Sequence, residues 1–267
     1  MALRTSVLDP REDFEVNALG TINVLEAARL SDSITLFCST NKVYGENVNM
    51  IPVKEGPKSY SFKDPTYEKG IPESFPIDRT GHSPYGASKL AADVYVQDYA
   101  HTYGLKTAVF RMSCIYGERQ FGVEDQGWLA WFVIATLTER PITIYGDGKQ
   151  VRDVLHVDDL VDAFTRFVDS KARHGVFNMG GGNKNTLSLL ELLDLLKSLT
   201  GKSPDVSTSE WRPSDQKVYV SDTTRAQEQL GWKPTITPIE GVKRVVRWVE
   251  ANRNLFGKAP PISPPIA

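Results

Sequence analysis

Two patterns of apolar residues alternate along the chain, one typical of helices and the other of buried strands. Residues 12–29 carry apolar side chains at helical spacing along one side: Phe14, Val16, Ile22, Leu25 and Ala28. Residues 34–38 (ITLFC) form a short, continuous apolar run, which is typical of a parallel strand buried on both faces. This alternation predicts an α/β fold.

The same patterns predict further elements as far as residue 252. The predicted helices cover residues 12–29, 83–103, 127–139, 158–169, 187–200, 222–230 and 238–252. The predicted strands cover residues 34–38, 107–112, 142–145, 154–156, 176–179 and 217–220. We expect Asp158 to cap the helix that follows it and Gly201 to end the helix before it.

Two segments depart from this alternation. Residues 47–79 are polar and rich in Pro and Gly, and loops of that length are usually functional or mobile. Residues 258–267 contain four prolines in ten positions. We therefore expect this last segment to be a disordered tail.

The composition narrows the classes of function. The chain has 267 residues, 40% hydrophobic and 24% charged, as in ordinary globular proteins. Its formal net charge of −2 argues against nucleic-acid and anionic-membrane partners, because phosphate binding needs surplus Lys and Arg. No apolar run approaches the ~18 residues of a membrane span, and residues 1–10 lack the apolar centre of a signal peptide. Cys38 and Cys114 have no metal-ligand spacing, so we expect no metal site and two reduced core cysteines of a cytoplasmic protein.

Tyr85 and Lys89 are the first candidates for chemistry. They are four residues apart in a predicted helix and therefore share one face. A tyrosine with a pKa of about 10 is a poor base at neutral pH, and lowering that pKa by ~3 units takes roughly 4 kcal/mol. One cation about 4 Å away supplies about that much at an effective dielectric constant near 20. Lys89 is thus able to make Tyr85 a proton acceptor, although most such pairs are ordinary residues of a helix surface.

A second candidate is the segment 39–45 (STNKVYG), directly after the predicted strand at 34–38. Hydroxyl groups at the carboxyl end of a parallel strand lie where α/β folds bind ligands. The alternative is a turn that the Ser and Thr side chains stabilise. Each feature is weak alone, but the two together and in this order favour a functional site.

These features resemble the extended short-chain dehydrogenase/reductase family, in particular its NAD-dependent nucleotide-sugar epimerases and dehydratases. The resemblance runs from about residue 12 to about residue 256. It lies in residues 17–27 (NALGTINVLEA), 39–45, 83–89 (SPYGASK), 110–111 (FR), 115–117 (IYG), 148–153 (GKQVRD), 156–160 (HVDDL), 177–181 (FNMGG) and 212–215 (RPSD). Three details look most like the CDP-sugar 2-epimerases of this family, namely residues 40–45, 119–132 and 148–156.

The resemblance implies a Rossmann-like, doubly wound parallel sheet, here incomplete, with a smaller α/β lobe for the substrate. Residues 1–114 with 155–180 would form the carboxyl-terminal part of the NAD-binding domain. Residues 115–154 with 181–257 would form the nucleotide-sugar lobe, and 258–267 the tail.

The resemblance also implies roles for individual residues. Thr40 would bond the reacting hydroxyl or keto oxygen, and Tyr85 would accept and return its proton. Lys89 would hold the nicotinamide ribose and, helped by the positively charged nicotinamide ring, lower the pKa of Tyr85. The other residues implied on the cofactor side are Asn17, with structural support as its main role, and Arg111. The implied substrate-binding residues are Thr40, Asn41, Lys42, Arg119, Gln120, Arg152, Arg212 and Asp215.

A nucleotide diphosphate needs permanently charged, planar partners. Arg152 and Arg212 fit, because a guanidinium group matches phosphate oxygens with paired hydrogen bonds. The alternative for each is a surface salt bridge with Asp153 or Asp215, and the residues alone leave both open. Aromatic residues in the segment 128–132 could stack on a base, but at helical spacing they are more often core residues.

The implied activity is an isomerase reaction: a hydride passes from C2 of a nucleotide-linked hexose to NAD and returns on the other face. The alternatives are a nucleotide-sugar 4-epimerase, a 4,6-dehydratase, or a non-catalytic truncated paralogue that binds a nucleotide sugar or a full-length subunit. Helices at residues 21–28 and 87–103 correspond to those that pair subunits in the family. We therefore expect a homodimer or a higher homo-oligomer.

One family feature is absent from the sequence. The glycine fingerprint G-x-x-G-x-x-G does not occur, and the glycines at 180–182 come late and lack its spacing. A βαβαβ half of roughly 80 residues would be missing, at ~30 residues for each βαβ unit. A misassigned start, a fragment or a degenerate paralogue would each explain this. We expect the 267-residue chain not to retain NAD.

Overall fold

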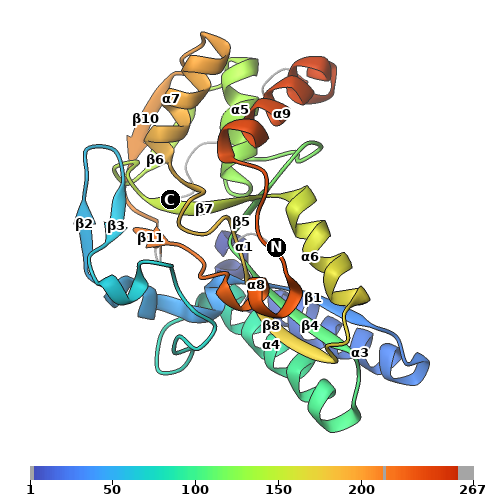
Figure 1. The fold of residues 1–267 in the computed structure, drawn as a ribbon. Coiled ribbons are helices and arrows are strands. Elements are labelled where there is room, and N and C mark those ends of the chain that lie inside the picture. The colour runs from blue at the N-terminus through green and yellow to red at the C-terminus, as the bar shows by residue number, and fades with distance from the viewer. Residues whose placement is uncertain (1–2, 213–214, 258–267) are drawn as a thin grey trace.

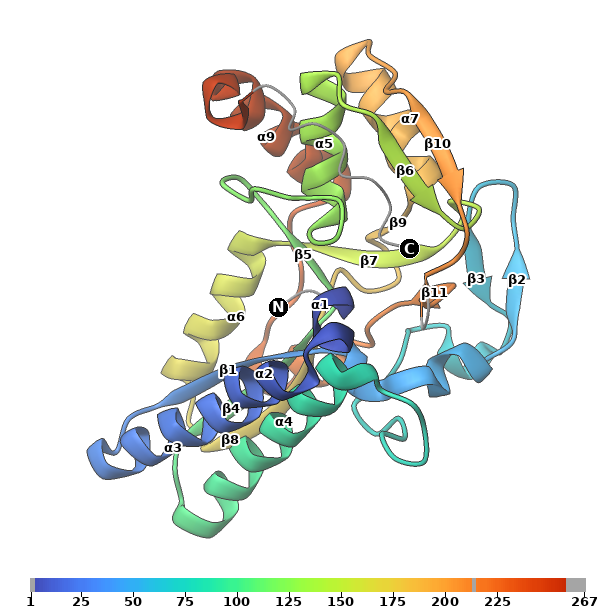
Figure 2. The same cartoon turned by 180° about the vertical axis from the view of Figure 1, so that it is seen from behind.

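The computed structural model describes residues 3–212 and 215–257. Within them, a parallel sheet joins β1 (Thr35–Thr40), β4 (Thr107–Met112) and β8 (His174–Met179) in that order. Helices α3 (Gly20–Ser31) and α4 (Ser83–Tyr103) cover one face of this sheet, and α6 (Val157–Asp169) and α8 (Thr224–Leu230) lie on the other (Figures 1 and 2). The predicted α/β fold with a parallel sheet is confirmed.

Alternation along β4 explains why both faces are covered. Val109 packs with Leu25 and Val96 of the α3–α4 layer. The next residue, Phe110, packs on the opposite face with Phe167. Successive side chains of a strand point to opposite faces, so an apolar strand needs a helical layer on each side.

In the part of the molecule at the top of Figure 1, the central strand is β7 (Val151–His156), which pairs with three short strands. These are β5 (Cys114–Tyr116), β9 (Thr186–Ser188) and β11 (Val218–Tyr219). A separate pair joins β6 (Ile142–Tyr145) to β10 (Val206–Ser209), a strand that the sequence did not predict. Helices α5 (Trp128–Thr138), α7 (Leu189–Thr200) and α9 (Pro238–Ala251) supply the core here. The residue boundaries of the two domains stay a prediction.

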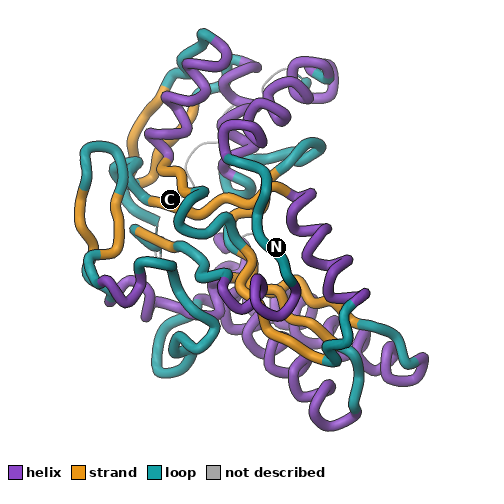
Figure 3. The backbone as a smooth tube through the Cα atoms, viewed as in Figure 1, coloured by secondary structure: helices purple, strands orange, loops and turns teal. Residues whose placement is uncertain are grey.

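The segment between β1 and α4 contains loops, short helical turns and a hairpin (Figure 3). A 3-10 segment covers Asn41–Met50, the hairpin pairs β2 (Val53–Glu55) with β3 (Tyr60–Phe62), and a second 3-10 turn covers Pro65–Tyr67. The predicted loop at 47–79 is therefore partly structured.

Near the amino end, helical structure begins earlier than predicted and is interrupted. The described elements are α1 (Leu3–Leu8), α2 (Pro10–Phe14) and a π-helical segment (Glu15–Leu19) that leads into α3. The pattern at residues 12–29 indicated one regular helix. An apolar periodicity does not reveal a π-helical turn, because that turn changes the backbone bonding while the chain stays helical.

Two expectations about the strand at 34–38 are wrong. β1 lies at the end of the sheet order, and its residues 35–37 are only half-buried. Cys38 is exposed, so it is not a core residue, whereas half-buried Cys114 packs against the hydrophobic core; both are free thiols. The strand buried throughout its length is β4, in the middle of the sheet, apart from half-buried Met112 at its end.

Helix ends also differ from the prediction in places. The backbone N–H of Asp158 donates to Nδ1 of buried His156, so His156, not Asp158, caps α6. Residues 186–188 form β9, so α7 begins later than the helix predicted at 187–200. The side chains of Ser188 and Glu191 each accept a hydrogen bond from the backbone N–H of the other and so cap α7. Gly201 ends α7 with a left-handed backbone, as predicted.

Among residues 3–212 and 215–257, no helix combines the length and apolar character needed to cross a bilayer. The predicted tail at 258–267 lies outside the described residues. The cytoplasmic location stays a prediction.

Candidate active site

The fold brings together the two segments that the sequence singled out. Thr40 is the last residue of β1, and Tyr85 lies in the first turn of α4. Gly86 permits this approach, because a Cβ there would lie 3.0 Å from the backbone oxygen of Lys42. A side-chain hydrogen bond then joins Tyr85 to Thr40.

The electrostatics of Tyr85 differ from the prediction. Burial raises the pKa of Tyr85 above its ordinary value, the hydrogen bond with Thr40 lowers it, and the charge of Asp13 raises it. The Lys89 ammonium instead donates to the backbone oxygen of Cys38 at 2.5 Å and lies 4.2 Å from the ring centroid of Phe37. The groups of the chain itself therefore raise the pKa of Tyr85, and its lowering with a bound nicotinamide ring stays a prediction.

Asp13 supports this arrangement and was missed from the sequence. It is fully buried and accepts hydrogen bonds from the Ser88 hydroxyl and, at 3.1 Å, from the Asn17 amide. These bonds tie α2 and the π-helical segment to α4 between Tyr85 and Lys89. Asn17 thus has a structural contact, in line with the supporting role expected for it. The sequence offered no signal, since an acidic residue in a helix usually faces water.

Arg111, which was predicted on the cofactor side, takes part in a buried ion pair in the structure. It is 4% exposed and pairs with fully buried Asp93, with Nε donating to Oδ2 at 3.0 Å. Its NH1 group donates to the Tyr44 hydroxyl and to the Glu73 backbone oxygen, both at 3.3 Å. These bonds engage most of its donors, so Arg111 ties β4 to α4 and to the segment before it.

A chain of hydrogen bonds leads from Thr40 towards Arg152. The Thr40 hydroxyl donates to Oδ1 of Asn41 at 3.3 Å, and Nδ2 of Asn41 donates to Oε1 of Gln216 at 3.4 Å. The Gln216 backbone N–H donates to Oδ1 of Asp215 at 2.9 Å. Arg152 donates to the same oxygen of Asp215 at 2.6 Å. Four predicted substrate residues are thus connected through one that was not predicted, Gln216.

Each arginine forms a salt bridge, and the partner of Arg152 is one of the two aspartates considered from the sequence, whereas the partner of Arg212 is not. Arg152 pairs with Asp215, whereas the Asp153 carboxylate accepts the backbone N–H groups of Gly182 and Ser221. Arg212 pairs with Asp125 at 3.0 Å. Neither pair is deeply buried, so both guanidinium groups can exchange a carboxylate for a phosphate.

The remaining predicted substrate residues lie in two places. Lys42 is half-buried after Thr40, and burial, reinforced by the charge of Arg152, lowers its pKa to about 8. Arg119 is exposed in the loop after β5, with a left-handed backbone, and takes no part in the chain of bonds. Gln120 donates to the backbone oxygen of Ile115 at 3.4 Å and faces Gly127. The structure therefore does not join Arg119 and Gln120 to the Thr40–Arg152 chain.

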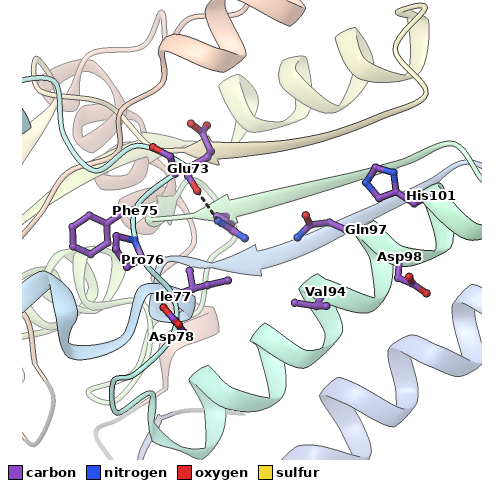
Figure 4. Close-up of a pocket in the computed structure, with 11 residues that line it drawn as sticks. Glu73, Phe75, Pro76, Ile77, Asp78, Val94, Gln97, Asp98 and His101 are labelled. Carbon is purple, nitrogen blue, oxygen red and sulfur yellow. Dashed lines mark hydrogen bonds between the residues drawn. The ribbon is translucent and has the colours of Figure 1, made fainter.

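Two cavities lie near these residues. One of about 700 Å³ is bordered by Arg212 and Asp215 and by the segment 48–53. The other, of about 580 Å³, lies between the segment 73–78 and α4, where Figure 4 shows the backbone oxygen of Glu73 bonded to a guanidinium group. Neither cavity borders Thr40, Tyr85 or Lys89. Of the two, only the first borders predicted substrate-binding residues, namely Arg212 and Asp215.

The aromatic residues of α5 and the buried histidine have structural surroundings. Phe132 is 4% exposed, and Trp128 and Trp131 pack against the same core as its neighbours. His156 accepts the cap bond described above, and its Nε2 lies 3.0 Å from a carboxylate oxygen of Glu118. The core interpretation of the α5 aromatics is the one that fits.

The residues present fit one half of a nicotinamide dinucleotide. Tyr85 and Lys89 present a hydroxyl and an ammonium on one face of α4, beside the exposed end strand β1. The Lys89 ammonium is held at the backbone of that strand and can donate to a ribose hydroxyl. The loop that would hold the pyrophosphate is not among the 267 residues.

The chain is similar to known proteins over most of its length. Residues 2–180 match the NAD dependent epimerase/dehydratase family. Over 260 residues the chain is 41% identical to the CDP-paratose 2-epimerase of Salmonella typhi, covering 94% of this chain and 75% of that protein.

Two solved structures of UDP-glucose 4-epimerases share the fold. One, from Thermotoga maritima with UDP-glucose, has a TM-score of 0.79 at 30% identity and covers 95% of this chain and 75% of that one. The other, from Thermus thermophilus in complex with NAD, has a TM-score of 0.78 at 31% identity and covers 94% and 75%. The Rossmann-like sheet expected from the sequence is confirmed. With its family match over more than half of its residues and a 41% identical relative, the chain belongs to the NAD dependent epimerase/dehydratase family.

Proposed function

We propose that this chain is an NAD-dependent epimerase that inverts C2 of a CDP-linked deoxyhexose, as in the conversion of CDP-paratose to CDP-tyvelose. The observation that carries the proposal is the bonded pair of Thr40 and Tyr85, continued by Asn41, Gln216 and Arg152. This chain of hydrogen bonds would join a pair that transfers a proton, Thr40 and Tyr85, to a cation suited to phosphate, Arg152. The 41% identity to a CDP-paratose 2-epimerase, against 30–31% to the two 4-epimerases, supports the substrate.

Tyr85 and Thr40 would act on the sugar hydroxyl that is oxidised. Thr40 hydrogen-bonds that oxygen, and Tyr85 takes its proton and later returns it. NAD, when bound, supplies the reversible removal of hydride. Because burial raises the pKa of Tyr85, the phenol needs added positive charge nearby before it can act as a base at neutral pH. Lys89 is in position to contribute part of that charge once its ammonium faces a ribose hydroxyl rather than Cys38.

The nucleotide end would be held by the two arginines. Arg152 is 15% exposed and Arg212 33%, so each can meet a phosphate without being stripped of all water. Arg212 is also stacked over the Tyr145 ring, 4.0 Å from its centroid, which keeps its planar group in one orientation. The cavity of about 700 Å³ beside Arg212 has room for part of a nucleotide.

The test is turnover in deuterated water. The chain is preceded by a glycine-rich dinucleotide-binding segment with the spacing G-x-x-G-x-x-G and supplied with NAD and CDP-paratose. We expect CDP-tyvelose with little deuterium at C2, because the hydride returns from the nicotinamide and not from solvent. Substantial deuterium at C2 would indicate deprotonation of carbon instead. Turnover of UDP-galactose or dTDP-glucose without turnover of CDP-paratose would refute the substrate and favour a 4-epimerase or a 4,6-dehydratase.

A further inference from the structure

Gln216 has a buried polar group without a partner. The residue is 1% exposed, and its Nε2 has no hydrogen-bond partner among the described residues. Its other polar atoms are engaged: Oε1 accepts from Asn41, the backbone oxygen accepts from Arg152 at 2.6 Å, and the backbone N–H donates to Asp215. A buried donor without an acceptor destabilises the free protein, so an acceptor that arrives with a ligand would remove that cost.

The surrounding bonds determine which end of the Gln216 amide is left over. The backbone N–H of Lys42 donates to the Thr40 oxygen at 3.3 Å, and the Thr40 hydroxyl donates to Oδ1 of Asn41 at 3.3 Å. The NH₂ group of Asn41 must then face Gln216 and requires an oxygen there. The NH₂ group of Gln216 is therefore the unpartnered one, and it can only donate.

The place of Gln216 in the chain of hydrogen bonds indicates which part of a bound ligand it would meet. Thr40, at one end of the chain of bonds, would contact the reacting hydroxyl, and Arg152, at the other, would contact phosphate. Gln216 lies between them and is neutral and more deeply buried than Arg152, which is 15% exposed. A buried neutral donor suits a neutral oxygen better than a charged phosphate, whose desolvation would go uncompensated there.

We infer that Gln216 contacts the substrate, and that its Nε2 donates to a neutral oxygen of the bound sugar between the reacting carbon and the diphosphate. The inference rests on the proposed function and adds to it a residue that distinguishes a nucleotide sugar from the bare nucleotide. A site built to hydrogen-bond a sugar oxygen discriminates strongly against a ligand that lacks it, because the buried donor stays unpaired.

The experiment measures binding and needs no turnover. The 267-residue chain and its Gln216→Met variant are titrated calorimetrically with CDP-paratose and with CDP. Methionine keeps the length of the side chain and removes the amide. We expect the affinity for CDP-paratose to fall about tenfold while the affinity for CDP changes less than about twofold.

Two further variants complete the experiment: Gln97→Met is the control, and Gln216→Glu replaces the donor group by a negatively charged acceptor. Gln97→Met removes a glutamine of α4 whose Nε2 already donates to Asp93 at 2.7 Å, and it should leave both affinities unchanged. Gln216→Glu keeps the oxygen that faces Asn41 but presents a second oxygen to the sugar. It should weaken CDP-paratose more than Gln216→Met does. A cooperative thermal unfolding transition shows that a variant is folded. If Gln216→Met is not folded, the affinities of Gln216→Glu test the role of Gln216.

The outcomes separate the two proposals. Unchanged affinity for CDP-paratose in the Gln216 variants, or equal losses for CDP-paratose and CDP, would overturn the role of Gln216. If the parent chain prefers UDP-glucose over UDP and binds neither CDP ligand, the CDP-sugar assignment fails, and the same variants tested with UDP-glucose and UDP decide the role of Gln216. If the parent binds no nucleotide sugar, both proposals fail.

Discussion

The phenol of Tyr85 is hydrogen-bonded to the hydroxyl of Thr40, although one residue begins a long helix and the other ends a strand. The bond lowers the pKa of Tyr85, but burial raises it by more, and Asp13 adds to the rise. The pair is therefore positioned for proton transfer, while its protonation state still depends on charge brought by the bound ligands. The fold therefore determines the geometry of the Tyr85–Thr40 pair, whereas the protonation state of Tyr85 also depends on the bound ligands.

Replacing Tyr85 by Phe should remove most turnover and leave ligand binding in place. The change deletes one hydroxyl and keeps the ring, and a general acid–base group typically contributes ~10² to 10⁴-fold to the rate. The rate of CDP-paratose conversion is measured in the protein that carries the glycine-rich segment. Tyr103→Phe, on an exposed residue of the same helix, is the matched control. A Tyr85→Phe rate within about threefold of the parent would rule out Tyr85 as the proton acceptor.

The affinity for CDP should fall as the pH rises through about 8. Lys42, beside Arg152 and Asp215, has its pKa lowered to about 8, so it is a cation below that pH and neutral above it. A diphosphate loses one favourable charge when Lys42 deprotonates. Titration of CDP binding between pH 7 and pH 9, a window centred on the lowered pKa of Lys42, measures this step. Lys42→Arg should bind with little pH dependence, since Arg stays charged; the same step in Lys42→Arg as in the parent would assign it to another group.

Asp93→Ala should destabilise the fold by about 3–5 kcal/mol, because it leaves the buried guanidinium of Arg111 without its counter-charge. Replacing both partners, as in Asp93→Leu with Arg111→Met, should recover a large part of that loss. Urea unfolding gives the free energies. The exposed pair of Arg166 and Asp162 is the control, and Asp162→Ala should cost less than about 1 kcal/mol. Equal effects at the two sites would show that burial does not set the strength of the Asp93–Arg111 pair.

We expect a homodimer or a larger homo-oligomer. Apolar side chains on α4 and on the helix before β1 are exposed in the single chain: Val94 (48%), Tyr95 (45%), Val16 (58%) and Val24 (59%). A second copy would cover this apolar surface. Light scattering at micromolar concentration measures the mass, and a Tyr95→Glu variant should shift it towards the monomer. A monomeric mass for the parent would contradict the prediction.

The 267-residue chain should not retain NAD through purification. Tyr85 and Lys89 can contact only the nicotinamide end, and the sequence holds no glycine-rich loop for the pyrophosphate. The supernatant of the denatured protein is assayed for NAD. One NAD for each chain in that supernatant would show that residues outside the family fingerprint hold the cofactor.

Much of the fold was predictable because it depends on local periodicity. The helix at 83–103 and the strand at 107–112 have the predicted bounds, since apolar spacing and the turn at Gly104 are both local signals. The sequence singled out Thr40 and Tyr85, and the resemblance to the family implied that both act on the same hydroxyl. Cys38 was misplaced because an apolar run does not tell whether its strand lies in the middle or at the end of a sheet.

The sequence by itself determined the α/β elements, the Tyr85–Lys89 face and the family. Only the tertiary structure decided the partners of the charged and polar groups. Arg111 is bound to Asp93, Arg152 to Asp215, and Asn41 to Gln216 across the molecule. The physical reason is that periodicity reports on burial along one element, whereas pairing and pKa depend on residues that chain folding brings close from distant positions.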